Sequence, residues 1–147
     1  MTHYQELMLV DAGPDDVFRL VTGIESWQHL FPHVRSVRSG RPGRWLVTYF
    51  WRWVPFSTTA SMRVDAARRM AEFRIGYRLC ARVVVHCAVD DGANGTSALR
   101  LETKVERVAP LFSPVVSLAA RELSQATLEM VRLLAESDRI ARQNIKD

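Results

Sequence analysis

Apolar and polar residues alternate with a period of two through the middle of the chain, from about residue 44 to residue 108. This period places successive side chains on opposite faces of an extended strand. Short turn segments interrupt the alternation, and strands joined by short turns are antiparallel neighbours. We expect five strands, each with one mainly apolar side. These sides consist of Trp45, Val47, Tyr49 and Trp51; Phe56, Thr58, Ala60, Met62 and Val64; Ala71, Phe73, Ile75 and Tyr77; Val83, Val85, Cys87 and Val89; and Leu99, Leu101, Thr103 and Val105.

The N-terminal part predicts a strand followed by two short helices. The strand covers about residues 3–10, and Pro14 suits the first turn of the helix that follows. Gly23 ends that helix. A second short helix is predicted from about Glu25 to Phe31, where Pro32 stops it.

The C-terminal part predicts one long helix, with Ser113 as its N-cap and its end near Ala141. Together these elements predict an α+β fold, in which a curved antiparallel sheet of about six or seven strands surrounds this helix. One helix covers only part of a wide sheet, so the remaining space is either filled by large side chains or left as a cavity. The apolar stripe of the helix comprises Val116, Ala119, Leu123, Met130, Val131 and Leu134.

The composition is that of an ordinary globular domain. The chain has 147 residues, of which 48% are hydrophobic, and we expect a single domain over residues 1–147. No apolar run approaches the roughly 20 residues of a membrane span, and the first residues do not resemble a signal peptide, so we expect a cytoplasmic protein. The net charge is +4, but arginines recur along most of the chain among acidic residues, and we expect no nucleic-acid binding.

Two motifs near the N-terminus resemble a known superfamily. Residues 12–18 (Ala-Gly-Pro-Asp-Asp-Val-Phe) are similar to the helix opening of START-like proteins, and residues 24–34 (Ile-Glu-Ser-Trp-Gln-His-Leu-Phe-Pro-His-Val) are similar to their second helix. The order of elements extends the resemblance over nearly the whole chain. It implies the helix-grip fold of polyketide cyclases, lipid-transfer domains and the birch-pollen allergen. This fold hosts enzymes and carriers alike, so it does not specify one activity.

Within this superfamily the chain most resembles tetracenomycin-type aromatase/cyclases. Those enzymes carry a serine and an arginine, two positions apart, on a central strand that faces the cavity, and Ser61 and Arg63 correspond to them. The resemblance implies that Arg63 stabilises the oxyanion of an aldol step while Ser61 holds a carbonyl or a water. Trp27 matches a cavity tryptophan. Two features depart from the pattern, since Val34 replaces a cavity tyrosine and residues 76–78 replace a glycine-proline-phenylalanine element.

The alternation along this strand favours a position of its serine and arginine outside the cavity. Ala60, Met62 and Val64 form the apolar side, which places Ser61 and Arg63 on the solvent side. Only a polar concave face or a β-bulge would turn them toward the cavity.

The resemblance and the apolar pattern together predict that the chain binds a hydrophobic small molecule between the sheet and the long helix, without a cofactor. Three functions fit this expectation: an aromatase/cyclase acting on a polyketide, a non-catalytic carrier of a lipid, quinone or similar molecule, and a ribosome-binding, toxin-like module with a filled core. The oligomeric state stays open. The residues that we expect around the ligand are Trp27, Phe31, Tyr49, Trp51, Phe73, Leu101 and Leu123.

Histidines and cysteines suggest no further chemistry. His29 and His33 have a spacing that binds zinc on a helix, but Pro32 lies between them and no third ligand is evident, so we expect two exposed polar residues and no metal. Cys80 and Cys87 are too far apart on one strand to form a disulfide, and we expect buried thiols.

An aromatic segment over residues 49–56 has a second potential use. Trp53 and Phe56 flank a predicted hairpin turn next to an arginine, a combination that favours a membrane interface. They would either touch a membrane surface transiently or close the mouth of the pocket.

Overall fold

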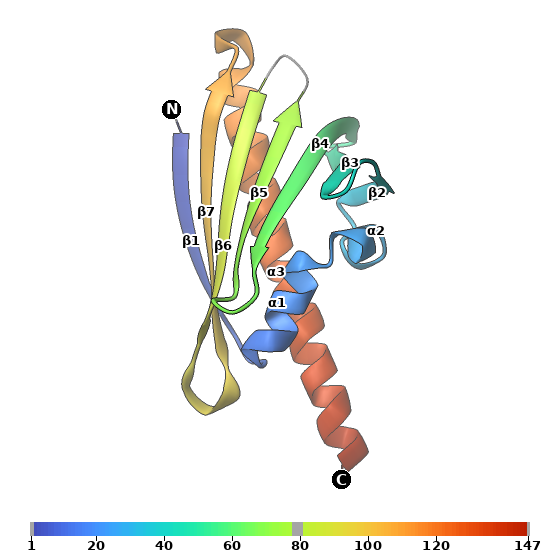
Figure 1. The fold of residues 1–147 in the computed structure, drawn as a ribbon, viewed down its shortest axis with the longest axis vertical. Helices are drawn as coiled ribbons and strands as arrows, with labels where there is room; N and C mark the ends of the chain where they lie inside the picture. Colours follow the sequence, from blue (N-terminus) through green and yellow to red (C-terminus); the bar gives the residue numbers. More distant parts are fainter. Residues whose placement is uncertain (1, 78–80, 147) are drawn as a thin grey trace.

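The computed structural model describes residues 2–77 and 81–146. Seven strands form one antiparallel sheet in the order β1-β7-β6-β5-β4-β3-β2, which curves around the long helix α3 (Figure 1). This arrangement confirms the predicted α+β fold. The strands are β1 (Thr2–Val10), β2 (Val34–Ser39), β3 (Arg44–Trp51), β4 (Val54–Asp65), β5 (Met70–Tyr77), β6 (Ala81–Asp91) and β7 (Ser97–Val108). The helices are α1 (Pro14–Thr22), η1 (Ile24–Ser26), α2 (Trp27–Leu30), η2 (Ala93–Gly95), η3 (Pro110–Phe112) and α3 (Ser113–Lys146).

The inner face of the sheet carries the alternating apolar residues that the sequence predicts. On β3 the side chains of Val47 and Tyr49 are buried, whereas Leu46 and Phe50, on either side of this pair in the sequence, are exposed. The same alternation buries every second residue of β7 over most of its length. The hydrophobic core therefore lies between the inner face of the sheet and the helices.

The helix α3 differs from its prediction at both ends. Ser113 has helical backbone angles (φ −54°, ψ −48°), so it is a helical residue rather than an extended N-cap. The 3₁₀ turn of η3 leads directly into it and replaces the cap. The helix also continues to Lys146 instead of ending near Ala141, and its C-terminal end projects beyond the sheet (Figure 1).

The hairpin between β3 and β4 has a strained turn. Trp51 pairs with Val54, which leaves Arg52 and Trp53 as a two-residue loop. Both loop residues have positive φ, 48° and 71°, the conformation that asparagine and glycine normally supply in such turns. Trp53 is 97% exposed at this tip. Phe56 lies farther along β4, half-buried against Tyr49, so it is not part of the tip.

None of the described helices combines the length and the apolar character that crossing a bilayer requires.

Cys87 is a buried free thiol, and burial raises its pKa to about 12. Cys80 lies outside the described residues.

Candidate ligand cavity

A cavity of about 90 Å³ lies between α3 and the inner face of the sheet. Pockets that hold drug-sized ligands usually measure roughly 300–1,000 Å³, so a multi-ring ligand requires the surrounding side chains or α3 to move outward. The residues that line the cavity are Val21, Trp27, Phe31, His33, Val34, Tyr49, Phe73, Ile75, Val83, Val85, Leu101, Thr103, Ala120, Leu123, Ser124 and Thr127.

Small side chains on α3 leave this space open. Ala120, Ser124 and Thr127 face the cavity from the helix, together with the half-buried Leu123. Farther along the same helix, Leu128 and Val131 are buried in the core. The helix thus fills the space under the sheet with large side chains in one part and leaves room for a guest in another.

Five aromatic rings form one side of the cavity. Trp27 lies against Phe31 and Phe73, with ring centroids 6.0 and 5.4 Å apart. The imidazole of His33 is nearly parallel to the ring of Phe31 (5.6 Å, 16°) and to that of Tyr49 (6.5 Å, 10°). These rings give the cavity flat walls that suit a planar guest.

His33 connects this wall to α3. Its Nε2 lies 3.0 Å from Oγ1 of Thr127, and the Thr127 hydroxyl lies 2.8 Å from the carbonyl oxygen of Leu123. The main-chain carbonyl of His33 also accepts a 2.8 Å hydrogen bond from the amide of Phe50. Burial lowers the pKa of His33 from its ordinary value of 6.5, because the imidazolium form loses its hydration there.

The cavity lining is uncharged apart from any proton on His33. Among the described residues that form it there is no aspartate, glutamate, lysine or arginine. Nε1 of Trp27 is a buried donor in this wall without a partner in the described part of the chain, and the side chain is 9% exposed. A buried donor without an acceptor is costly, so a ligand oxygen at this position would stabilise the site.

Six of the seven residues predicted around the ligand line this cavity: Trp27, Phe31, Tyr49, Phe73, Leu101 and Leu123. Their expected role in binding stays a prediction.

The seventh residue, Trp51, lies outside the cavity. Its indole Nε1 donates a 2.6 Å hydrogen bond to Oε2 of Glu122, and Nη2 of Arg52 donates a 2.7 Å bond to the other oxygen. Both hydrogen bonds lower the pKa of Glu122, and the bond from Arg52 has the larger effect. Trp51 is therefore occupied in joining the β3–β4 hairpin to α3.

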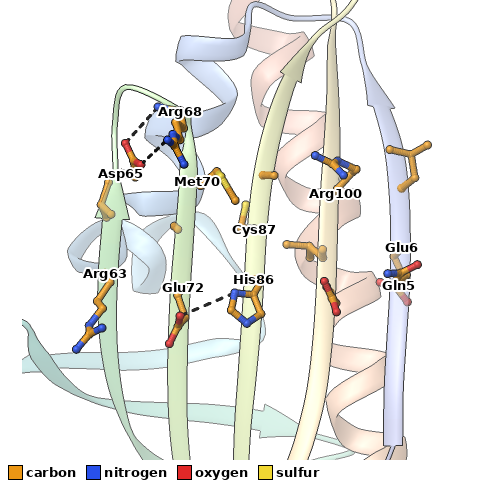
Figure 2. A pocket seen from close by; sticks show the side chains of 16 residues that line it. Gln5, Glu6, Arg63, Asp65, Arg68, Met70, Glu72, His86, Cys87 and Arg100 are labelled. Atoms are coloured by element: carbon orange, nitrogen blue, oxygen red, sulfur yellow. Dashed lines mark hydrogen bonds and ion pairs between the residues drawn. The ribbon is translucent and has the colours of Figure 1, made fainter.

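Ser61 and Arg63 face away from the cavity. Ala60 and Met62 belong to the core side of β4, and the strand has no bulge in this region, so Ser61 and Arg63 lie on the opposite face. Figure 2 looks onto this outer face, where Arg63 borders a hollow of about 570 Å³ and α3 passes behind the sheet. The expectation that these two residues act inside the cavity is incompatible with this placement.

Arg63 belongs instead to a row of alternating charges across the outer face. It pairs in register with Glu72, and Glu72 pairs with His86 (Figure 2). His86 in turn pairs with Glu102. The pKa of Glu72 is lowered, mainly by a hydrogen bond from Arg74 and also by the charges of His86 and Arg63. Opposite charges on adjacent strands stabilise a sheet modestly, which accounts for this row without a ligand.

His33, Ser124 and Thr127 are polar cavity residues that sequence reasoning missed. His33 was expected to be exposed, because it follows a proline at the end of a short helix. In the structure only His29 of the predicted pair is exposed. No local pattern indicates this inward position, because Thr127, which contacts His33, lies 94 residues farther along the chain. Within the described residues no group of three potential metal ligands occurs.

No protein-family profile matches the chain, and no curated protein matches its sequence. Solved structures do resemble it. The di-domain ARO/CYC BexL from the BE-7585A biosynthetic pathway superimposes with a TM-score of 0.74 at 22% identity, covering 90% of this chain and 45% of BexL. The chain thus spans slightly less than half the length of that protein.

Two other solved structures resemble this chain over nearly their whole length. A START superfamily protein from Mycobacterium smegmatis gives a TM-score of 0.76 at 13% identity, covering 92% of this chain and 97% of the other. The Zhui aromatase/cyclase from a Streptomyces species gives 0.73 at 15% identity, with 92% and 93% covered. At these identities the similarity concerns the fold, and it confirms that the chain has the START-like fold shared by aromatase/cyclases and START superfamily proteins.

Proposed function

We propose that this protein binds a hydrophobic, uncharged small molecule between α3 and the sheet. The observation that carries the proposal is the cavity itself, an apolar space with aromatic walls in the middle of the fold. A protein without a ligand gains stability by filling such a space, since cavities in a core are costly. The small side chains of α3 that keep it open therefore support a binding function over a toxin-like module with a filled core.

A carrier role agrees better with the lining than cyclisation through Ser61 and Arg63. The solved structures that resemble this chain include aromatase/cyclases, so a polyketide remains a candidate ligand. A cyclase needs a group that stabilises developing negative charge at the reacting carbonyl. Arg63 lies across the sheet from the cavity, and a reaction there would have to use His33, Tyr49 or bound water.

Two measurements together test the binding proposal. The first is mass spectrometry of small molecules that copurify with the protein under native conditions, where an uncharged apolar compound in stoichiometric amount is expected. The second is the melting temperature in the presence of fatty acids, quinones and polycyclic aromatics, because a ligand that binds only the folded state raises it. The proposal would be contradicted if no small molecule copurified with the protein and no member of the panel changed its melting temperature.

We also propose a transient membrane contact through Trp53. The side chain is almost fully exposed at the tip of the hairpin that Arg52 and Glu122 fix to α3. Tryptophan beside arginine favours the interface of a bilayer. Phe56, the other residue expected there, packs against Tyr49 and takes no part. Cosedimentation with anionic vesicles should decrease in Trp53→Ser and remain unchanged in Leu133→Ser, which removes an exposed apolar side chain elsewhere.

A further inference from the structure

The contacts of His33 with α3 define which ring nitrogen carries the proton. The Thr127 hydroxyl has one proton, and a carbonyl oxygen can only accept. The 2.8 Å contact to Leu123 and the 3.0 Å contact to His33 are both satisfied only if Thr127 donates to the carbonyl and accepts from Nε2–H. The neutral imidazole then has an unprotonated Nδ1, which is a hydrogen-bond acceptor.

The surroundings of His33 keep the ring neutral and in place. Phe31 and Tyr49 hold the imidazole between parallel rings, and Thr127 fixes it from α3. No carboxylate within the described residues forms an ion pair with it, and burial alone lowers its pKa. Nδ1 has no hydrogen-bond partner in the part of the chain that the structure describes, and His33 lines the cavity, so Nδ1 is the acceptor that this residue offers to a guest.

The cavity thus offers two polar groups of opposite character. Nδ1 of His33 accepts a hydrogen bond, and Nε1 of Trp27 donates one and lacks an acceptor. A carboxylate ligand does not match this lining, since no cationic side chain among the described lining residues would neutralise it. A neutral planar molecule with a hydroxyl and a second oxygen matches both groups.

We propose that His33 is a specificity-determining residue of the cavity, which selects neutral aromatic ligands that carry a phenolic or enolic hydroxyl by accepting its hydrogen bond at Nδ1. This inference rests on the proposed ligand-binding function and adds the class of ligand. It predicts discrimination between two molecules of nearly equal shape that differ only in their ability to donate.

The test is a calorimetric titration with 1-naphthol and with 1-methylnaphthalene, in which a methyl group replaces the hydroxyl. The variants are wild type and His33→Phe, which preserves a flat ring between Phe31 and Tyr49. The ratio of the two affinities should shift against 1-naphthol by about 2- to 12-fold in the variant, the range that one net hydrogen bond gives. Comparing ratios cancels the difference in hydrophobicity between the probes.

The outcomes separate the two proposals. If neither probe binds the wild type, the inference about neutral phenolic ligands is overturned. The ligand-binding function fails as well only if no compound copurifies and no member of the melting panel binds. If both bind and the affinity ratio is the same in wild type and His33→Phe, only the role of His33 is overturned.

Nitrogen-15 NMR of the histidine rings gives a second test that needs no substitution and so does not depend on folding of the variant. We expect Nε2 of His33 to be protonated and Nδ1 to be unprotonated, with a change at Nδ1 when 1-naphthol is added. Protonation at Nδ1 instead, or an Nδ1 signal that ignores saturating 1-naphthol, would overturn the proposal.

Discussion

Arg63 shows how one residue changes the functional interpretation. The side chain carries the resemblance to aromatase/cyclases, yet it lies in the charge row of the outer face beside Glu72. The charge of Arg63 acts on Glu72 across neighbouring strands, and such interactions between charges at the protein surface contribute little to stability. Water can hydrate the outer face, so the loss of one charge there is compensated.

Arg63→Ala should therefore leave the protein nearly unchanged. We expect the free energy of unfolding to stay within about 0.5 kcal/mol of wild type, and the affinity for a bound apolar probe to remain the same. Phe73→Ala is the matched change on the inner face and should cost about 3–5 kcal/mol. Urea titrations and calorimetry measure both. A large loss of probe affinity in Arg63→Ala would contradict the outward placement.

His33 predicts how stability depends on pH. Its pKa is lower in the folded protein than the ordinary value of 6.5, so the unfolded chain binds more protons just below that pH. The contribution of neutral His33 to stability is therefore complete above pH 6.5 and is lost as the pH falls through the folded pKa. Urea midpoints measured from pH 7.5 downward should decrease, and the decrease should be smaller in His33→Gln.

Glu6 has the opposite effect on the pH dependence of stability, and it provides a comparison for His33. Burial raises its pKa from 4.5, so its contribution to stability is lost as the pH rises above that value. The difference between wild type and His33→Gln isolates the histidine from this carboxyl. Identical pH profiles for the two proteins would show that His33 is not buried in its neutral form.

At the scale of elements, α3 holds the molecule together. It buries one face against the sheet, where Val131 is fully buried, while Leu133 two positions along is 58% exposed. Val131→Asp places a charge among apolar side chains and should cost about 3–5 kcal/mol. Leu133→Asp, the control, should cost less than about 1 kcal/mol. Comparable melting temperatures for the two variants would mean that α3 does not cover the core as described.

The β3–β4 turn makes a prediction of the opposite sign. Trp53 has φ +71° and is almost fully exposed, so it contributes backbone strain and little packing. Glycine adopts this conformation without a steric penalty. It also makes the unfolded chain more flexible, so more conformational entropy is lost on folding, which offsets part of the gain. Trp53→Gly should therefore stabilise the protein by about 0.5–1 kcal/mol in urea titrations. A destabilised variant would indicate that Trp53 packs against the protein.

The elements were largely predictable because alternation reports burial directly. Period-two patterns identified the inner faces of β3 and β7, and the outward position of Arg63 followed from the same alternation. Resemblance suggested the reverse and was wrong on that point. His33 was not predictable, because its burial depends on α3, which lies far away in sequence and supplies Thr127. The hydrogen bond from Trp51 to Glu122 likewise joins segments that are distant in the sequence.

At the scale of the whole molecule, the cavity exists because one helix covers a wide sheet with side chains of uneven size. Its volume of about 90 Å³ is too small for a multi-ring ligand, so the cavity must widen when such a ligand binds. The part of α3 beside the cavity carries small and half-buried residues, whereas the part around Val131 is tightly packed. We expect widening to occur in the former part.

The most direct test of ligand binding fills the cavity from α3. Ala120→Leu adds apolar volume at a lining position, and Ser137→Leu adds the same side chain at an exposed position of the same helix. The measurement is calorimetric titration of wild type and both variants with menadione, an uncharged quinone. We predict binding to wild type and Ser137→Leu, and at least about tenfold weaker binding to Ala120→Leu, which should fold with equal or greater stability. Equal menadione affinity in all three proteins would contradict a binding site between α3 and the sheet.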